Sequence, residues 1–498
     1  MRQKHNAILA FDQGTTSSRA ILFSVDGVVL GVSQKEFEQI FPVDGWVEHR
    51  AADIWGSVLD VGREMVAKAV SLNLTIIAAG IANQRETTLV WDHKTGEVVY
   101  NAIVWQDRRT SKHCKALSGE GSLDNVRQAT GLLLDPYFSA TKIAWILDNV
   151  SGLRSRAERG ELCFGTVDSF LIWKMTGGLK HVTDATNASR TSLYNIRKGM
   201  WDPDLCQLFN VPMAMLADVK DSAGYFGDCP AEVFGQAFPI CGVAGDQHAA
   251  TIGQACFTKG SIKSTYGTGC FMLANTGQDC LLSENNLLST IAYQINGQVT
   301  YGLEGSIFIS GAVIQWLRDG MGFLSGAAES EFLATSLSNN EGVYMVPALT
   351  GLGAPHWSPS ARGAIFGLTR DTGPAHFVRA ALESVAFQTY DLIQAMRADG
   401  IEPKGLRVDG GMVDNNFLMQ FLSDILDLQV EKPVITETTA LGAALLAMLG
   451  SGQIDTLDDT AKLWQLETPF QPRMDISKRD ALLVGWQTAV KRTLLDCN

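Results

Sequence analysis

The chain has 498 residues, which is too long for a single core and predicts two or more domains. Its 46% hydrophobic and 19% charged residues are typical of a soluble globular protein. The formal net charge of −13, with no run of Lys or Arg, argues against a nucleic-acid partner.

The sequence carries no signal for a membrane, for secretion or for an oxidising compartment. No apolar run reaches the roughly 18 residues that are needed to span a bilayer. The first apolar run is ended by Asp12 and is too short for a signal peptide. The nine cysteines are scattered without a C-x-x-C pair, so we expect reduced thiols and neither a disulfide framework nor a zinc site. Together these features predict a cytoplasmic protein.

The first expected element is a hairpin over residues 7–23. Residues 8–11 and 20–23 are apolar runs that predict two buried strands. The turn between them, DQGTTSSR at 12–19, offers hydroxyl and backbone N–H groups that suit phosphate oxygens. Arg19 adds a cation, and Asp12 at the strand end is placed to hold a hydrated Mg²⁺. A polar hairpin tip without a ligand is the alternative, and this segment alone does not exclude it.

Strands and helices then alternate, which predicts an α/β fold. We expect helices at 55–69 and 141–149, and strands at 75–81, 102–105, 163–165 and 240–244. Polar residues follow three of these strands: Arg85 with Glu86, the stretch 106–109, and Asp246 with Gln247. Ligands of open α/β sheets bind beyond the carboxyl ends of strands, so these clusters mark a candidate site.

The polar clusters match the needs of a small polyol. Arg85 would donate to hydroxyl groups, while Glu86 and Gln247 would accept and orient them. A carboxylate at Asp246 would take a hydroxyl proton as that oxygen attacks phosphorus. Apolar walls would come from aromatic side chains, Trp105 and Phe271. The alternatives are a surface ion pair for Arg85 and Glu86, worth about 0–1 kcal/mol, and a helix N-cap for Asp246.

The hairpin pattern recurs in the second half of the chain. Residues 261–266 and 270–273 are strand-like runs around the turn Gly267-Thr268-Gly269. This repetition predicts two domains, 1–255 with the polyol site and 256–498 with the nucleotide site. Further on, a long helix is expected at 375–398 and a strand at 406–409 that ends in glycines, which let a nucleotide approach the backbone. The small apolar residues at 440–449 predict a helix packed in the core.

Eight segments carry a resemblance to a known family. They are FDQGTTSSR (11–19), NQRETT (83–88), WQDRR (105–109), TDATNASRT (183–191), AGDQ (244–247), YGTGCF (266–271), and the stretches 137–149 and 363–383. In these segments the chain resembles the FGGY carbohydrate kinases and, within them, is similar to the bacterial-type glycerol kinases. The matches run in order from residue 8 to about residue 450.

The resemblance implies two actin-like domains of the ribonuclease-H type around a central ATP cleft, and transfer of the ATP γ-phosphoryl group to glycerol with Mg²⁺. Asp246 would be the general base. Glycerol would be held by Arg85, Glu86, Tyr137, Asp246 and Gln247, with Trp105 and Phe271 as walls. Phosphates and Mg²⁺ would meet Asp12, Thr15, Thr16, Ser17, Arg19 and Thr268. The nucleotide would also touch Gly311, Gln315, Gly411 and Asn415.

Two other functions stay open at this point. One is an FGGY kinase for another sugar or polyol, and the other is an ATPase of the actin or heat-shock chaperone type, which has no polyol site. We also expect a homo-oligomer, either a dimer or a tetramer. The stretch 221–240, where some bacterial glycerol kinases bind fructose 1,6-bisphosphate or carry a phosphorylated histidine, contains no Lys, Arg or His. We therefore expect neither form of regulation.

Overall fold

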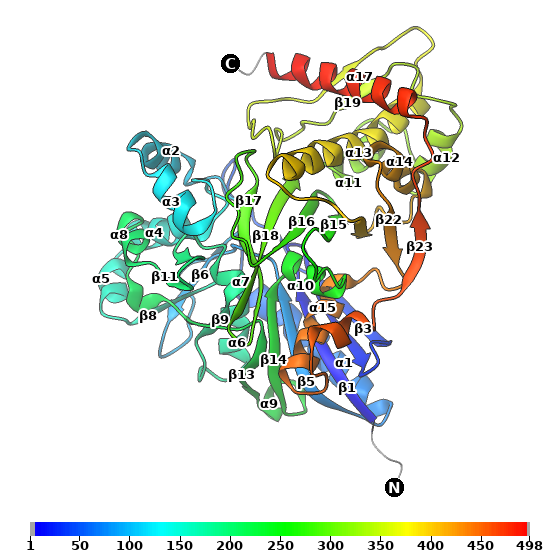
Figure 1. The fold of residues 1–498 in the computed structure, drawn as a ribbon. Helices are drawn as coiled ribbons and strands as arrows, with labels where there is room; N and C mark the ends of the chain where they lie inside the picture. The colour runs from blue at the N-terminus through cyan, green and yellow to red at the C-terminus, as the bar shows by residue number, and fades with distance from the viewer. Residues whose placement is uncertain (1–4, 496–498) are drawn as a thin grey trace.

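Two large sheets organise the computed structural model, which describes residues 5–495 (Figure 1). The first sheet has six strands, in the spatial order β13 (Ala223–Cys229), β14 (Phe238–Gly245), β5 (Leu74–Asn83), β1 (His5–Gln13), β2 (Ser17–Ser24) and β3 (Val29–Glu36). The second has seven, in the order β17 (Leu288–Ile295), β18 (Gln298–Ile307), β16 (Cys270–Gly277), β15 (Ile262–Tyr266), β21 (Leu406–Asp409), β22 (Val430–Pro433) and β23 (Leu466–Phe470).

Six strands of the second sheet repeat the topology of the first, and β17 is an additional edge strand, antiparallel to β18. In the first sheet, β1, β2 and β3 pair antiparallel, β5 and β14 join in parallel, and β13 closes the edge antiparallel. In the second, β15, β16 and β18 pair antiparallel, β21 and β22 join in parallel, and β23 closes the edge antiparallel. The predicted repeat of a strand, a turn and a strand is therefore confirmed, because β15–β16 occupies the place of β1–β2.

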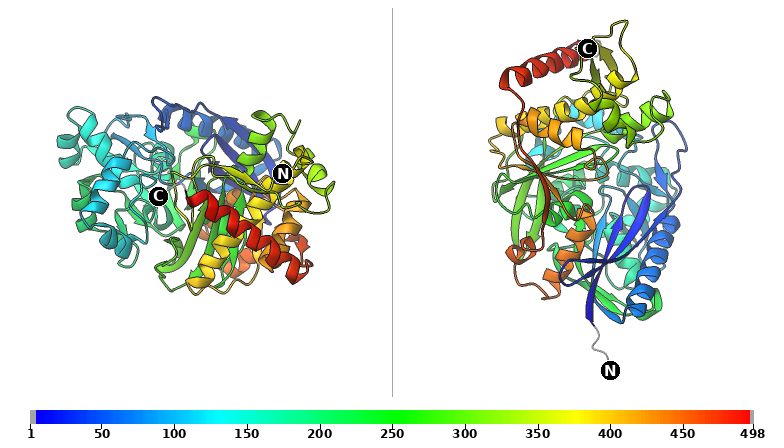
Figure 2. Two further views of the ribbon diagram at one scale, coloured as in Figure 1. Left: turned by 90° about the horizontal axis from the view of Figure 1, so that it is seen from above. Right: turned by 90° about the vertical axis from the view of Figure 1, so that its right-hand side faces the viewer.

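Helices and short strands surround these sheets, as two views at right angles show (Figure 2). The first half contains α1 (Ala51–Ser71), α2 (Ser111–Gly119), α3 (Leu123–Thr130), α4 (Ser139–Asn149), α5 (Leu153–Glu158), α6 (Val167–Met175), α7 (Ala185–Ala188), α8 (Pro203–Leu208), α9 (Ala231–Phe234) and α10 (Asp246–Gly253). The second half contains α11 (Gly311–Asp319), α12 (Glu329–Thr335), α13 (Pro374–Ala398), α14 (Asn416–Leu426), α15 (Thr438–Gly450), α16 (Leu457–Ala461) and α17 (Ile476–Leu494). Short strands pair as β4 (Glu48–His49) with β7 (Ala102–Ile103), β6 (Leu89–Asp92) with β8 (Leu162–Gly165), β9 (Val182–Asp184) with β12 (Asp218–Lys220), β10 (Tyr194–Asn195) with β11 (Met200–Trp201), and β19 (Tyr344–Val346) with β20 (Ala364–Phe366).

The apolar run of β1 is continuous because both faces of its sheet are covered. Leu9 and Phe11 belong to the core that contains residues of α1, whereas Ile8 and Ala10 belong to the core that contains residues of α15. All four side chains are fully buried. Figure 1 shows α15, drawn in orange, beside the blue strands β1 and β5. A helix from the second half of the chain thus covers the first sheet.

Small residues allow α15 to approach its neighbours closely. A Cβ atom on Gly442 would lie 1.8 Å from the carbonyl oxygen of Ala249 in α10, and one on Gly80 of β5 would lie 2.0 Å from that of Ala443. Any larger side chain at these glycines would push α15 away from the first sheet. The expected core helix at 440–449 is confirmed, and it packs against α10 and the strands of the first half. The division of the chain at residue 255 stays a prediction.

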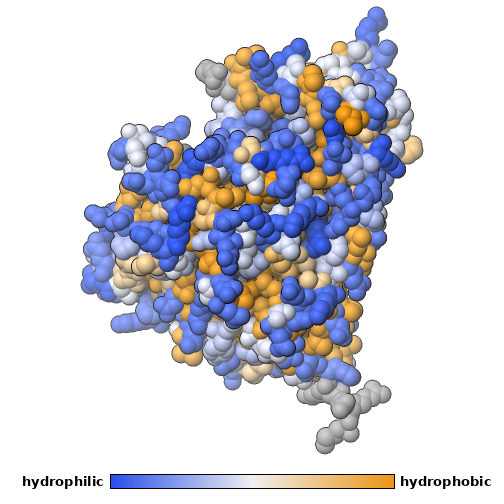
Figure 3. Space-filling view, in the orientation of Figure 1, coloured by the Kyte–Doolittle hydropathy of each residue, from blue (hydrophilic) through white to orange (hydrophobic). Residues whose placement is uncertain are grey.

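The strand expected at 102–105 is shorter than predicted. It ends at Ile103, because the backbone N–H of Asp107 donates to the carbonyl of Val104 at 3.0 Å and turns the chain. No helix among residues 5–495 is long and apolar enough to cross a membrane. Hydrophilic and apolar residues are interspersed over the face in Figure 3. Eight cysteines, from Cys114 to Cys280, are free thiols, and Cys497 lies outside the described residues.

Candidate active site

The turn after β1 is held by neighbouring segments. The N–H of Gly14 donates to the carbonyl of Ser17 at 2.9 Å and closes the turn. The carbonyls of Thr15 and Thr16 accept hydrogen bonds from Gln39 Nε2 at 2.9 Å and from the N–H of Phe37 at 3.2 Å. Engaging these carbonyls fixes the backbone of the turn, which positions the hydroxyl-bearing side chains at 15–17.

Arg19 is held by a partner that the sequence did not indicate. Its Nη1 forms an ion pair with Glu437, the residue before α15, and its Nη2 donates to Gln34 Oε1 at 3.0 Å. Arg19 is therefore engaged by protein groups in this structure. The pair joins the first hairpin to a segment more than 400 positions away, and no local pattern marks Glu437 as its partner.

Asp12 lies where its charge is costly. Burial raises the pKa of its carboxyl to about 7; Arg19 opposes the shift, and the nearby charges of Asp246 and Glu437 add to it. Such a carboxyl is suited to a divalent cation, whose charge would compensate its ionised form. No three His, Cys, Asp or Glu residues in the described part of the chain group as a metal site. Mg²⁺ typically takes one or two carboxylates and completes its shell with waters and phosphates, so the donor set at Asp12 fits.

Arg85 and Glu86 lie inside the protein. Their exposed fractions are 3% and 1%, which excludes the alternative of a surface ion pair. Arg85 Nε lies 3.1 Å from Asp246 Oδ1, and its two terminal nitrogens pair with Glu304 on β18. Glu86 adopts a φ of 59°, in the left-handed region, and its Oε1 accepts from Arg190 Nε at 2.6 Å. Burial raises the pKa of Glu86, although Arg190 and Arg85 oppose the shift.

Asp246 begins α10 directly after β14. The N-cap position is Gly245, so the side chain of Asp246 does not act as the helix N-cap. Its Oδ1 accepts from the N–H of Gln247 at 2.7 Å and forms an ion pair with Arg85 Nε at 3.1 Å. No donor within residues 5–495 binds Oδ2, and the side chain is 28% exposed. Oδ1 therefore anchors the Asp246 side chain, and Oδ2 is left to accept a hydrogen bond or a proton from a ligand.

A buried lysine orients Gln247. Lys263 on β15 donates to Gln247 Oε1 and to Thr265 Oγ1 at 3.0 Å, and it is fully buried. An ammonium group can only donate, so the bonded atom of Gln247 is its carbonyl oxygen. The amide NH₂ of Gln247 is then left to donate to a ligand. Burial lowers the pKa of Lys263. Sequence reasoning missed this residue, which sits in the apolar pattern of a strand.

Three aromatic rings from separate segments meet beside this cluster. The Trp105 ring lies edge-on to Tyr137 and to Phe271, with centroid distances of 5.6 and 6.0 Å. Trp105 Nε1 donates to Thr15 Oγ1 at 2.9 Å, which connects the aromatic wall to the first turn. The guanidinium of Arg85 lies 6.0 Å from the Phe271 centroid. The expected walls and Tyr137 therefore gather around Arg85.

The segments expected to hold the nucleotide meet around the second turn. The N–H of Gly311 donates to the carbonyl of Gly267 at 2.9 Å, and that of Ala312 to Thr268 at 3.0 Å. A Cβ on Gly311 would lie 2.7 Å from the Gly267 oxygen, so this contact requires glycine. The N–H of Met412 reaches Tyr266 at 3.2 Å and brings residue 411 to the same turn.

Two expected nucleotide contacts lie on helices beside this turn. Gln315 is an exposed residue of α11, and Asn415 caps α14 by accepting from the N–H of Leu418 at 2.9 Å. Asn415 is tied to the turn through its own N–H, which donates to the carbonyl of Met412 at 3.1 Å.

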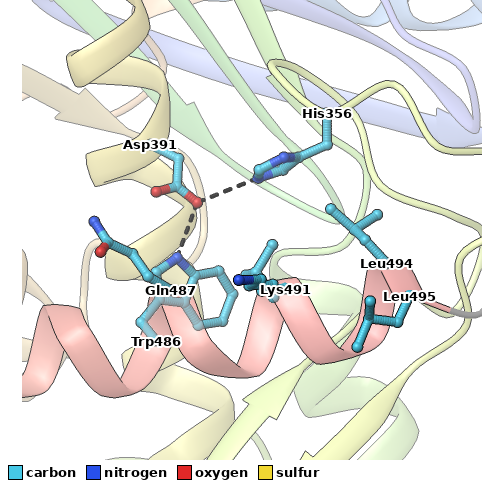
Figure 4. Close-up of a pocket in the computed structure, with 8 residues that line it drawn as sticks. His356, Asp391, Trp486, Gln487, Lys491, Leu494 and Leu495 are labelled. Atoms are coloured by element: carbon cyan, nitrogen blue, oxygen red, sulfur yellow. Dashed lines mark hydrogen bonds and ion pairs between the residues drawn. The ribbon is translucent and has the colours of Figure 1, made fainter.

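A separate surface pocket lies between α13 and α17 (Figure 4). Its volume is about 390 Å³, and it is lined by His356, Asp391, Trp486 and other residues of α17. Asp391 accepts from Trp486 Nε1 at 2.9 Å and lies 3.5 Å from His356 Nε2. None of the lining residues belongs to the clusters described above, so this pocket is distinct from the candidate active site.

Comparison with known proteins agrees with this geometry. Residues 7–253 match the N-terminal domain of the FGGY family of carbohydrate kinases, and residues 262–451 match its C-terminal domain. Glycerol kinase of Rhodospirillum centenum is 57% identical over 98% of both chains, and glycerol kinase 1 of Pseudomonas aeruginosa is 56% identical over 97% of this chain and 98% of its own. The crystal structure of Plasmodium falciparum glycerol kinase with ADP is 36% identical, with a TM-score of 0.92 and 99% coverage of both chains. Xylulose kinase from Lactobacillus acidophilus shares the fold, with 19% identity, a TM-score of 0.87 and 98% coverage of both. The two sheets are thus the actin-like ATPase domains expected from the sequence, and the chain belongs to the FGGY family of carbohydrate kinases.

Proposed function

We infer that this protein is an ATP-dependent glycerol kinase, which transfers the γ-phosphoryl group of ATP to glycerol and forms sn-glycerol 3-phosphate and ADP. The observation that carries the inference is the cluster of buried Arg85 and Glu86 with Asp246 beside three aromatic rings, in a chain 56–57% identical to full-length glycerol kinases. An actin-type or chaperone ATPase has no use for such a polyol site.

Asp246 is proposed as the general base. Its Oδ1 is held by Arg85 and by the N–H of Gln247, and its Oδ2 is left to accept the proton of the attacking hydroxyl group. A base held by two donors on one oxygen presents the other in a fixed direction, which lowers the entropy cost of the proton transfer.

The remaining polyol contacts follow from hydrogen-bond capacity. Glu86 accepts from hydroxyl groups, while Arg85 and the NH₂ of Gln247 donate to them. Tyr137, Trp105 and Phe271 enclose the carbon chain and exclude water from the phosphoryl group, which strengthens the polar contacts. Burial raises the pKa of Tyr137, so its hydroxyl stays protonated as a donor.

The two turns are proposed to hold the triphosphate of ATP. Phosphate oxygens would meet Thr15, Thr16, Ser17 and Arg19 from the first turn and Thr268 from the second. The rest of the nucleotide would contact Gly311, Gln315, Gly411 and Asn415. Asp12 would hold a hydrated Mg²⁺, which neutralises negative charge on the phosphates when it is bound. We also propose a cytoplasmic homo-oligomer.

Substrate choice tests the proposal directly. Initial rates are measured with purified protein and MgATP in an ADP-coupled assay, with glycerol, xylulose and gluconate as acceptors. We expect kcat/KM for glycerol to exceed the other two by at least about a hundredfold, because sugar chains extend beyond the space enclosed by the rings. A higher kcat/KM for xylulose or gluconate would show that glycerol is not the preferred substrate. A rate of ADP formation that none of the three acceptors changes would refute the assignment as a polyol kinase.

A further inference from the structure

A carboxylate from the second sheet lies between two arginines of the first half of the chain. Glu304 is on β18, whereas Arg85 follows β5 and Arg190 follows α7. Oε1 of Glu304 accepts from Arg190 Nη2 at 3.0 Å and from Arg85 Nη2 at 3.3 Å, and Oε2 pairs with Arg85 Nη1. Glu304 is 1% exposed. Both of its oxygens are therefore occupied by cations from the other half.

These contacts and the ion pair with Asp246 engage all three guanidinium nitrogens of Arg85. A guanidinium has five N–H groups in a fixed fork. Nε forms an ion pair with Asp246, and one N–H of each terminal nitrogen donates to Glu304. One N–H on each terminal nitrogen is then left for a ligand. The direction of those two donors is set by Asp246 and Glu304 together, because a planar group held at three points cannot rotate.

Arg190 connects Glu86 to Glu304. Its Nε donates to Glu86 Oε1 at 2.6 Å while its Nη2 donates to Glu304. Its Nη1 has no acceptor within residues 5–495, and its guanidinium lies 5.3 and 5.7 Å from the ring centroids of Phe138 and Tyr137. The carboxylate of Glu86 is thus oriented by a cation that itself depends on Glu304.

Two arginines and two glutamates form a buried cluster whose charges sum to zero. Arg85, Arg190, Glu86 and Glu304 have exposed fractions of 0–3%. Burial alone would raise the pKa of Glu304, but Arg190 and Arg85 outweigh it and lower the pKa, so Glu304 stays ionised. A buried guanidinium without its counter-ion is strongly unfavourable, so loss of the Glu304 charge would drive both arginines to new positions.

The strand that carries Glu304 also leads to the nucleotide segment. β18 ends at Ile307, and Ser310, Gly311 and Ala312 then contact the second turn. The charge between the two arginines and the segment proposed to contact ATP therefore lie on one strand and its direct continuation.

We propose that Glu304 and Arg190 are positioning residues of the polyol site: Glu304 aligns Arg85 from the opposite domain, Arg190 aligns Glu86, and the site is complete only when the two halves are in contact. This inference rests on the proposed function. The proposal predicts that Glu304 affects glycerol affinity without contacting glycerol, because it acts by orienting Arg85 and Arg190.

The test is Glu304→Gln in the full-length chain, which removes the charge and keeps the shape. Calorimetric titration measures the glycerol Kd without turnover, and the coupled assay measures the KM of ATP. We expect the glycerol Kd to rise roughly ten- to hundredfold, while the KM of ATP changes less than about threefold. Wild-type protein that binds glycerol without phosphorylating it would refute the proposed function alone. Wild-type protein that does not bind glycerol would refute both.

Glu383→Gln is the matched control. Glu383 is also buried and also pairs with an arginine, at 2.7 Å from Arg379, but it lies on α13. We expect its glycerol Kd to stay within about twofold of wild type. If Glu304→Gln does not fold, Glu304→Asp keeps the charge, shortens its reach, and should show the same glycerol-specific loss. An unchanged glycerol Kd in a folded Glu304 variant overturns the proposal, as does an equal rise for glycerol and ATP, or an equal effect of Glu383→Gln.

Discussion

The sharpest test of the mechanism is Asp246→Asn. In the structure Oδ1 of Asp246 accepts from the N–H of Gln247 at 2.7 Å and forms an ion pair with Arg85 Nε at 3.1 Å. An asparagine carbonyl oxygen still accepts from the N–H of Gln247, and Arg85 keeps Glu304 as its counter-ion, so the side chain keeps its position. The NH₂ group then replaces Oδ2, the atom that would take the proton. The substitution therefore removes proton acceptance and one of the two charges that pair with Arg85.

The size of the effect follows from this geometry. General bases typically contribute on the order of 10²- to 10⁴-fold to the rate, or about 3–5 kcal/mol of barrier at 1.36 kcal/mol per factor of ten. Because the bond from Gln247 survives and Glu304 still balances the charge of Arg85, glycerol affinity should change less than about fivefold. A lost hydrogen bond between glycerol and a charged group would cost more, about 1.5–3 kcal/mol. The loss should thus appear in kcat and not in binding.

Three measurements separate these effects. The ADP-coupled assay gives kcat, calorimetry gives the glycerol Kd, and thermal unfolding reports the Tm. Asp228→Asn serves as the control, because Asp228 is an exposed aspartate that bonds only Tyr225 among the described residues. Turnover of Asp246→Asn within about threefold of wild type would show that Asp246 does not take the proton and would refute the reasoning.

Three further predictions follow from the same structure. Arg85→Ala should raise the glycerol KM roughly ten- to hundredfold with less effect on ATP; an unchanged glycerol KM in steady-state kinetics would remove Arg85 from the polyol site. Burial, with a further contribution from Asp184, raises the pKa of Asp168 from 3.8 to about 7, so folding binds a proton between these two values, and stability is lost as the pH rises from 3.8 to about 7. The Tm of wild type should therefore fall between about pH 4 and 7 relative to Asp168→Asn and level off above pH 7, and parallel Tm profiles would contradict this. Fructose 1,6-bisphosphate at millimolar concentration should not inhibit initial rates, because the stretch 221–240 contains no Lys, Arg or His. Saturable inhibition would contradict this and would mean that a neighbouring cation completes a binding site. Lys220, which donates to the Tyr225 carbonyl at 3.0 Å, is such a cation.

Much of the fold could be predicted because its signals are local. The apolar runs of β1 and β2, the glycine and hydroxyl residues between them and the repeat of this pattern at β15–β16 are all contiguous in the sequence. Polar residues after strands identified Arg85, Glu86 and Asp246, since the carboxyl ends of parallel strands gather at one edge of a sheet. Strand ends were less accurate, as the early end at Ile103 shows, because a turn depends on partners outside the strand.

The sequence by itself determined the elements, the repeated hairpin and the chemical character of the site, because burial patterns and turn residues act over a few neighbouring positions. Only the tertiary structure decided which charges face each other. Arg190 and Glu304 are 114 positions apart, and Arg19 and Glu437 are 418 apart. It also decided that α15 covers the first sheet. Such pairings have no local signature, since a buried charge is stable only beside a counter-charge that chain folding brings to it.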